Sequence, residues 1–150
     1  MLARTHTAFG FLSGLALAPL AAPASLPLFV GISTFTSLFP DVDHPEAKIH
    51  HYLKFTRIIP RFVEHRGIFH SIWIGGLGTL GLYFVAPWVG MAFGVGYLSH
   101  LVGDSLTKEG VNYLSPLAQL RIAGPINTGG IAEHVLLIAI VAASIAKLVL

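Results

Sequence analysis

The chain has 150 residues, of which 54% are hydrophobic and only 11% are charged, whereas about a quarter of the residues of an ordinary soluble domain carry a charge. This balance argues against a soluble globular protein and against a disordered one. The net charge of +2 is too small and too dispersed for a nucleic-acid-binding protein, so we expect no direct binding of nucleic acid. Because the chain has no cysteine, disulfides, thiolate catalysis and iron–sulfur clusters are excluded. The eight histidines are the unusual feature of so weakly charged a chain.

Apolar runs predict helices in five places: Thr7–Leu20, Leu26–Phe39, Ile68–Ala86, Trp88–Gly103 and Ile131–Leu150. The first two are separate helices because Pro19 and Pro23 divide the run, and a proline in a helix interior costs about 3 kcal/mol. Both are shorter than the ~20 residues that cross a hydrocarbon core unaided, so local thinning of the bilayer or a re-entrant hairpin would accompany them. The third and fourth segments are rich in glycine, which permits close packing of helices in lipid.

Polar residues concentrate between the second and third segments. The stretch Asp41–Arg66 carries more than half of the formally charged side chains, and we expect one connected loop or short surface helices there. A loop rich in glycine, proline and asparagine, Gly124–Gly130, precedes the last segment. A secretory signal peptide is an alternative for the first segment, because Arg4 precedes an apolar run and Ala22-Pro23-Ala24 has the form of a cleavage site. The apolar run that follows at once favours a retained helix.

The charges predict the orientation of the segments. If the five segments cross a bilayer in turn, every Lys and Arg except Lys147 falls on one side, which the positive-inside rule makes cytoplasmic. All acidic residues and histidines lie on or next to that side, where ionisable groups mark candidate sites. We therefore predict an all-α, multi-pass integral membrane protein, a bundle of four to five short helices that forms one membrane-embedded domain over residues 1–150. Its active face is expected to be cytoplasmic.

Two motifs could supply metal ligands. His100 and Asp104 are four residues apart on one predicted helix face, so an imidazole and a carboxylate can reach one metal ion. A hydrogen bond between them at the helix end is the alternative. In Pro40-Asp41-Val42-Asp43-His44-Pro45 the two prolines restrict the backbone, so the turn can present Asp41 and Asp43 rigidly. An ordinary interfacial turn is the alternative there.

A third motif, His65-Arg66-Gly67-Ile68-Phe69-His70-Ser71, opens the third segment. We expect Gly67 to break the helix between the two histidines. His70 is a candidate ligand, and His65 is either a ligand or a group that faces phosphate. Arg66 could neutralise an anionic substrate or meet lipid headgroups.

The remaining candidates lie near the two ends of the chain and in the polar loop. His6 precedes the first apolar segment on the same side as the other motifs, although an interfacial histidine is the alternative. Glu133 opens the last helix, where an acidic residue also suits the helix dipole. We expect the other histidines of the polar loop to be solvated: His44, His50 and His51.

Histidine and aspartate without cysteine suit zinc, manganese or iron better than calcium or magnesium. The predicted metal ligands are His6, Asp41, His70, His100 and Asp104. These are too many for one four-coordinate site with an open position, whereas two ions bridged by Asp104 would use them. The predicted catalytic or substrate-facing residues are Asp43, His65, Arg66 and Glu133.

Four motifs in order resemble the YdjM-type family. They are Thr5-His6 with Gly10, the Pro-Asp-x-Asp-His-Pro turn, His65-Arg66-Gly67-x-x-His70-Ser71, and Ser99-His100-Leu101-x-x-Asp104 followed by Leu106-Thr107 and Gly110. The resemblance spans nearly the whole chain. It implies an inner-membrane protein with metal-dependent hydrolase activity, and the family is also described as binding LexA.

A more distant likeness is to the zinc-dependent phospholipase C and P1 nuclease group. In that group an N-terminal His, an Asp, a His and a His-x-x-x-Asp pair build a helical multi-zinc site that cleaves phosphoesters. The matching positions are His6, Asp41 or Asp43, His70, His100 and Asp104. The later His-x-x-x-Glu ligands have no counterpart, since Glu133-His134 has another order and spacing, so the likeness implies no third metal.

These observations predict a metal-dependent hydrolase that cleaves a phosphoester of an amphiphilic lipid or lipid-linked substrate. Arg66, Lys108 or Arg121 would neutralise the substrate charge. The expected partners are the lipid bilayer and the substrate, and a protein partner is left open. Two alternatives remain. A metal-ion or proton transporter would place its ligands near the bilayer midplane, and a non-enzymatic membrane protein would use a structural metal to support partner binding.

Overall fold

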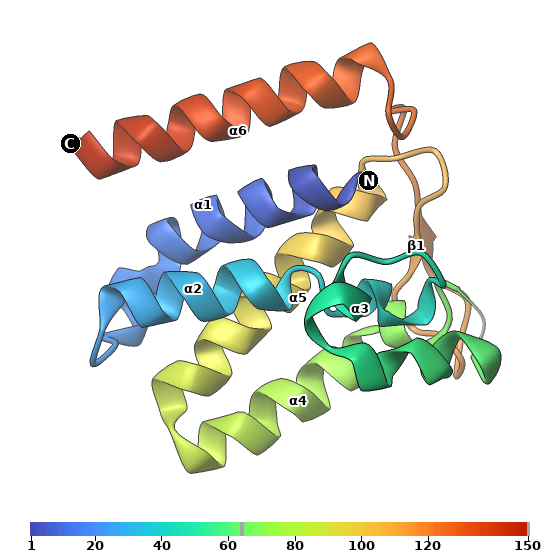
Figure 1. Ribbon diagram of the computed structural model, residues 1–150, viewed down its shortest axis with the longest axis horizontal. Helices are drawn as coiled ribbons and strands as arrows, with labels where there is room; N and C mark the ends of the chain where they lie inside the picture. The colour runs from blue at the N-terminus through green and yellow to red at the C-terminus, as the bar shows by residue number, and fades with distance from the viewer. Residues whose placement is uncertain (64, 150) are drawn as a thin grey trace.

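The computed structural model describes residues 1–63 and 65–149, and helices dominate it (Figure 1). The longer helices are α1 (Ala3–Ala21), α2 (Leu26–Thr36), α4 (Ile72–Val85), α5 (Pro87–Ser105) and α6 (Ile131–Val149). They correspond to the apolar segments predicted from the sequence, so the mostly helical fold class is confirmed. Leu150, the last residue of the fifth predicted segment, lies outside the described residues.

Prolines set several helix boundaries. Ala22 ends α1 in the left-handed region, at a φ of 40°, and Pro23 follows it. The second helix ends at Thr36 rather than at the predicted Phe39, because the next residues form bonds of the i→i−3 type and Pro40, which has no N–H to donate, starts a 3₁₀ helix. Pro87 stands at the first position of α5, where its missing N–H costs nothing.

The polar stretch folds into short helices, one of the two forms expected for it. They are η1 (Pro40–Asp43), α3 (Ile49–Tyr52) and η2 (Lys54–Arg61), and a further 3₁₀ turn, η3 (Ile68–His70), follows at the start of the third apolar segment. The third apolar segment was predicted to be helical from Ile68, but its α-helix begins only at Ile72. Ser71 between η3 and α4 has an extended backbone, so the direction of the chain changes just after His70.

A small hairpin after α5 was not predicted. Strands β1 (Val111–Asn112) and β2 (Arg121–Ile122) pair antiparallel, with Val111 opposite Ile122. Two residues per strand carry no hydrophobic alternation that a sequence pattern could reveal. Strand β1 contacts α5, the helix that carries His100 and Asp104.

Helix α5 is the centre of the bundle and contacts α1, α2 and α4. Glycine permits the closest approaches: a Cβ atom at Gly96 would lie 2.1 Å from the Ser33 carbonyl oxygen of α2. At Gly90 it would lie 2.5 Å from the Tyr83 nitrogen of α4. The glycine-rich segments thus permit close helix packing, as the sequence predicts.

The long helices share one polar end. The N-terminus, the short helices and the hairpin lie together there, and the C-terminus lies at the opposite end (Figure 1). Helix α6 packs on α1 and is otherwise largely exposed. Among the described residues, α6 alone is both long and apolar enough to cross a membrane, and α4 is apolar but shorter.

Candidate metal centre

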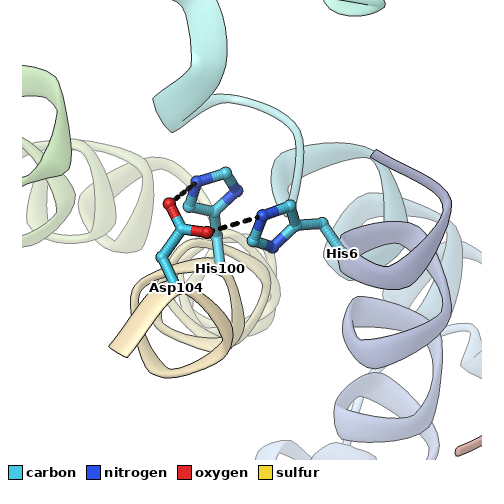
Figure 2. Close-up of side chains that lie close together, drawn as sticks. All are labelled: His6, His100 and Asp104. Atoms are coloured by element: carbon cyan, nitrogen blue, oxygen red, sulfur yellow. Dashed lines mark ion pairs between the residues drawn. The ribbon is translucent and has the colours of Figure 1, made fainter. Parts of the chain in front are cut away.

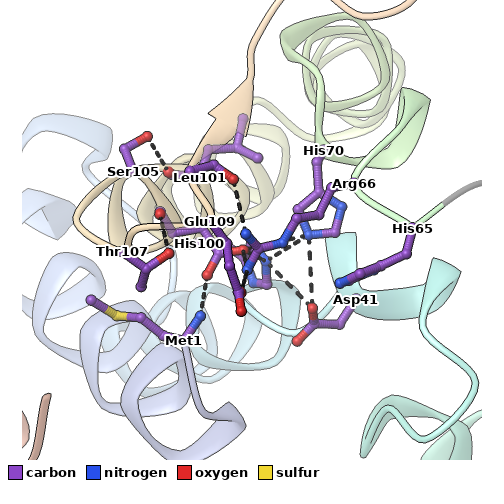
Figure 3. A network of polar contacts seen from close by, with 12 residues as sticks. Met1, Asp41, His65, Arg66, His70, His100, Leu101, Ser105, Thr107 and Glu109 are labelled. Atoms are coloured by element: carbon purple, nitrogen blue, oxygen red, sulfur yellow. Dashed lines mark hydrogen bonds and ion pairs between the residues drawn. The ribbon is translucent and has the colours of Figure 1, made fainter. Parts of the chain in front are cut away.

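Residues from four elements meet at the polar end of the bundle. Helix α1 brings His6, η1 brings Asp41, η3 brings His70, and α5 brings both His100 and Asp104 (Figures 2 and 3). Between 0 and 1% of the side-chain surface is exposed in four of these residues, namely His6, His70, His100 and Asp104. Asp41 is partly exposed. The structure therefore brings together all five predicted metal ligands.

Two carboxylates each lie within metal-ligand spacing of the same pair of imidazoles. The Nε2 atoms of His70 and His100 are 3.2 Å apart, and each is 3.7 Å from Asp41 Oδ1. Asp104 Oδ2 lies 3.7 Å from His70 Nε2 and 3.6 Å from His100 Nε2. A tetrahedral zinc site with bonds of about 2.0–2.2 Å has edges of about 3.3–3.6 Å. Asp41 Oδ1, His70 Nε2 and His100 Nε2 are thus placed to hold one ion of this size, and Asp104 Oδ2 lies at a similar distance from the same two imidazoles.

Hydrogen bonds orient both imidazoles toward this point. His100 Nδ1 is 2.7 Å from the Ser37 carbonyl oxygen, and His70 Nδ1 is 3.0 Å from Asp43 Oδ2. Both partners are acceptors, so each Nδ1 carries the hydrogen and each Nε2 is the ring nitrogen that faces the centre. The two Nε2 atoms are 3.2 Å apart, so either a hydrogen carried by one of the rings or a metal cation can lie between them. This is the arrangement of metal-binding histidines whose other ring nitrogen is held by a neighbouring acceptor.

The carboxylates of the polar loop favour positive charge beside the Nε2 atoms of His70 and His100. Burial alone would lower the pKa of His70, but the neighbouring carboxylates of Asp41 and Asp43 outweigh burial and raise that pKa to about 9. Burial would raise the pKa of the Asp41 carboxyl, yet His100 and His70 hold it well below its usual range. His65 and His70 likewise lower the pKa of Asp43 against the effect of its burial.

His6 adds a third imidazole to the cluster, beside His100 and Asp104. Its ring stacks on His100, with centroids 3.7 Å apart and an interplanar angle of 11°. Neither of its buried ring nitrogens makes a hydrogen bond within the described part of the chain, although Nε2 lies 3.1 Å from Asp104 Oδ1 (Figure 2). Asp104 therefore directs Oδ2 toward His70 and His100 and Oδ1 toward His6 and the Met1 nitrogen, as a bridging carboxylate would.

Asp43 supports the centre from the side of the polar loop. Its buried carboxylate accepts hydrogen bonds at Oδ2 from His70 Nδ1 and from the Arg66 main-chain nitrogen, the latter at 2.9 Å. Asp43 Oδ1 lies 2.7 Å from His65 Nδ1. Arg66 has a φ of 64°, a left-handed conformation that is uncommon without glycine. Asp43 thus orients one buried histidine and one partly exposed histidine.

Arg66 lies over the centre rather than in the solvent (Figure 3). Its Nη2 is 3.2 Å from Asp104 Oδ2 and 2.9 Å from Glu109 Oε2, and its Nη1 donates to the Gly110 carbonyl oxygen at 3.0 Å. It borders an open cavity of about 670 Å³, which Asp41, His65 and Arg121 also line. Glu109 was not among the predicted site residues, because only the fold brings it to Arg66.

Glu133 lies apart from the cluster. Its Oε1 accepts a hydrogen bond from the Leu2 nitrogen at 2.7 Å, and its Oε2 accepts one from the Gly129 nitrogen at 2.6 Å. These bonds join the start of α1 to the loop before α6. These contacts give Glu133 a structural role, and its catalytic or substrate-facing role stays a prediction.

The prediction that the loop histidines are solvated is wrong for His50. This side chain is buried, with Nδ1 2.7 Å from Thr56 Oγ1 and Nε2 2.9 Å from the His44 carbonyl oxygen. The compact turn formed by α3 and η2 encloses it. His51 is exposed as expected, and His44 is half-buried beside the His65 ring.

The fold and the cluster define a helical protein with buried histidine and aspartate groups that could hold a metal ion. A family model described as YdjM inner membrane protein matches residues 1–149, so the chain belongs to this family, and the resemblance inferred from the motifs is confirmed. It is similar to the proteins named inner membrane protein YdjM from Escherichia coli (strain K12) and Shigella flexneri. Each is 34% identical over 110 residues, which cover 67% of this chain and 55% of the relative. The chain therefore spans about half the length of these relatives, and no solved structure matches it significantly.

Proposed function

We propose that the protein is a multi-pass inner-membrane hydrolase that depends on a divalent metal and cleaves a phosphoester of a lipid or lipid-linked substrate at the cytoplasmic face. The observation that carries the proposal is the pair of imidazoles of His70 and His100, 3.2 Å apart and each 3.6 to 3.7 Å from the carboxylates of Asp41 and Asp104, beside an open cavity that Asp41 lines. Family membership supports the membrane, because both relatives are named inner membrane proteins.

The exposed apolar surface also supports a membrane environment. Phe84 and Val85 of α4 are 82% and 84% exposed, and Leu77 and Ile138 are each 69% exposed. Large contiguous apolar surfaces are uncommon on soluble monomers. All the long helices have one end at the polar side, which suits alternate crossings (Figure 1).

The donor set favours zinc, with manganese or iron as alternatives, since it joins imidazole and carboxylate without thiolate. Asp41, His70, His100 and Asp104 would hold the first ion, and His6 with the other oxygen of Asp104 would take part in holding a second. A divalent metal in this position would polarise a phosphoryl oxygen and lower the pKa of a water molecule.

The residues around the cavity supply the remaining chemistry. Asp43 holds Nδ1 of His65, so Nε2 is the ring nitrogen of His65 that is left to exchange a proton with substrate or water. Arg66 and Arg121 line the same cavity and would offset the charge of a phosphoester. Glu109 balances Arg66 when no substrate is bound.

A structural metal in a partner-binding membrane protein is the second candidate. Four protein ligands at tetrahedral spacing complete a closed shell, and structural zinc sites have that form. A transporter is less well supported, because the cluster lies at the helix ends and not near their middle.

Turnover distinguishes the two candidates. We expect zinc-loaded protein in lipid nanodiscs to hydrolyse phospholipid or lipid-phosphate substrates in a panel that also contains carboxyl esters and water-soluble phosphodiesters. Apoprotein prepared with a chelator is the control. Metal-loaded protein that cleaves no ester in this panel would favour the structural-metal candidate.

The proposed topology predicts that Lys54 and Val149 lie on opposite sides of the membrane. Single-cysteine variants at these exposed positions can be labelled without ambiguity, because the natural chain has no cysteine. A membrane-impermeant maleimide should label the Val149 variant from the periplasm and the Lys54 variant only after the membrane is opened. Labelling of both from the same side would contradict the multi-pass arrangement.

Arg66→Gly is expected to keep the bound metal and to lower turnover about 100-fold, the scale seen when one charge-stabilising donor is lost. Glycine adopts the positive φ of this position without strain, so the variant removes the guanidinium and leaves the backbone turn intact. Arg57→Gly, at an exposed position of η2, is the control for loss of a basic residue. Metal analysis beside turnover provides the measurement, and unchanged turnover in Arg66→Gly would exclude this role.

A further inference from the structure

An apolar groove runs between helices α1, α2 and α6. It consists of two open cavities of about 650 and 550 Å³, which share the side chains of Phe11, Leu38 and Leu148 and are therefore continuous. Neither the proposed chemistry nor the metal cluster uses this groove. Its position between an exposed helix and the rest of the bundle leaves it open to the side.

The groove has about the length of one lipid leaflet. Its wall on α1 extends from Arg4 to Leu15, and its wall on α6 extends from Leu137 to Leu148. Eleven helical steps of about 1.5 Å give about 16 Å for each wall. Half of a hydrocarbon core of about 30 Å is about 15 Å. One hydrocarbon chain of a lipid therefore fits along the groove.

The end of the groove nearest the metal centre is basic. Arg4 and Lys48 line this end, and both are exposed. Lys48 also lines the cavity over the cluster, so the groove and that cavity meet at its side chain. Glu46 is the acidic residue beside Lys48 in that cavity, whereas Glu109 is paired with Arg66. An apolar channel with a basic end is complementary to a hydrocarbon chain with an anionic head.

We propose that this groove holds one hydrocarbon chain of a phosphate-headed lipid, with the head group in the cavity over the metal centre. The inference rests on the proposed function and names its substrate class, a phosphate-headed lipid. One hydrocarbon chain of this lipid would lie in the groove, and its phosphate would lie near Lys48. A soluble phosphoester would use only the cavity. A helix of a second copy of this chain would also cover an apolar groove, but it would leave the basic end unmatched.

Two glycines provide a matched pair of variants. Gly31 lines the groove, and Gly81 lies on α4 outside it. Both are exposed, and a Cβ at either position would meet nothing within 4 Å. Gly31→Trp should therefore fill the groove without disturbing the fold, and Gly81→Trp is the control. Val141→Trp and Ile138→Trp, both at exposed positions of α6, form a second pair in which only Val141 lines the groove.

The experiment uses the full chain in phosphatidylcholine nanodiscs and a hexadecylphosphonate with a diazirine at the end of its chain. The phosphonate cannot be hydrolysed, so labelling does not depend on turnover. We expect photolabelling near Leu15, Leu26 and Leu148, competed by excess hexadecylphosphonate but not by hexadecanol. Gly31→Trp and Val141→Trp should lower this labelling about tenfold, and the two control variants should leave it unchanged.

The outcomes separate the groove from the chemistry. Labelling that is not saturable, that spreads over α4, or that persists in both groove variants would overturn the inference. If Gly31→Trp instead abolished self-association and left the labelling unchanged, the groove would bind a second copy of the chain. This result would also overturn the lipid inference. Saturable labelling in the groove of a protein that cleaves no ester would support the lipid groove and overturn the hydrolase proposal alone.

Discussion

Asp104→Ala is expected to lose bound metal and hydrolysis together. The two oxygens of Asp104 face different parts of the cluster, Oδ2 toward His70 and His100 and Oδ1 toward His6. Removing the carboxylate therefore takes a ligand from both proposed ions. Metal content should fall to the background level of a chelated sample, and turnover should fall below detection.

Asp104→Asn separates loss of charge from loss of volume, because it keeps the shape of the side chain. It should also lose most of its metal. Glu109→Gln is the matched control, since Glu109 contacts the same arginine but no predicted ligand among the described residues. Circular dichroism checks that each variant keeps its helices. Full metal content in a folded Asp104→Ala variant would contradict the bridging role.

Asp43→Asn is expected to weaken metal binding about 10- to 100-fold, as loss of a supporting carboxylate does at other metal sites. The reason is that Asp43 orients His70 at Nδ1 and so directs its Nε2 to the centre. The same change releases His65, so turnover should fall further than metal occupancy alone explains. Metal titration monitored by a competing chelator gives the metal affinity. Turnover at saturating metal measures the loss of activity that comes from the release of His65.

Glu133→Gln is the control for removing a buried carboxylate. Glu133 accepts two backbone hydrogen bonds at a distance from the cluster, so this variant should lose thermal stability and keep its metal affinity. Equal metal affinities in Asp43→Asn and the wild type would show that His70 does not depend on this hydrogen bond.

The sequence could predict the helices because their signals are local. The prolines at 23 and 87 mark turns that the structure retains, and the apolar runs are long enough to identify a helix without tertiary information. The late start of α4 could not be predicted in this way. Ile68 and Phe69 are as apolar as the residues of α4, and His70 in the 3₁₀ turn is held by its hydrogen bond to Asp43 from another element.

The candidate ligands could be identified by residue type and spacing, but their partners could not. His100 and Asp104 lie on one helix, so their proximity follows from helical geometry. The stacking of His6 on His100 and the contact of Glu109 with Arg66 join residues far apart in the chain, and only the fold determines them. The hydrogen bonds of Glu133 to the nitrogens of Leu2 and Gly129 are likewise long-range or loop contacts that the sequence does not indicate.

Metal analysis of the detergent-purified protein tests the central claim most directly. Inductively coupled plasma mass spectrometry on the wild type and on Asp104→Ala, purified side by side, gives the metal identity and the number of ions per chain. We predict one or two zinc, manganese or iron ions per wild-type chain and none in the variant. A wild-type protein that carries no such ion after incubation with these metals, or a variant that retains the full number, would contradict the metal centre.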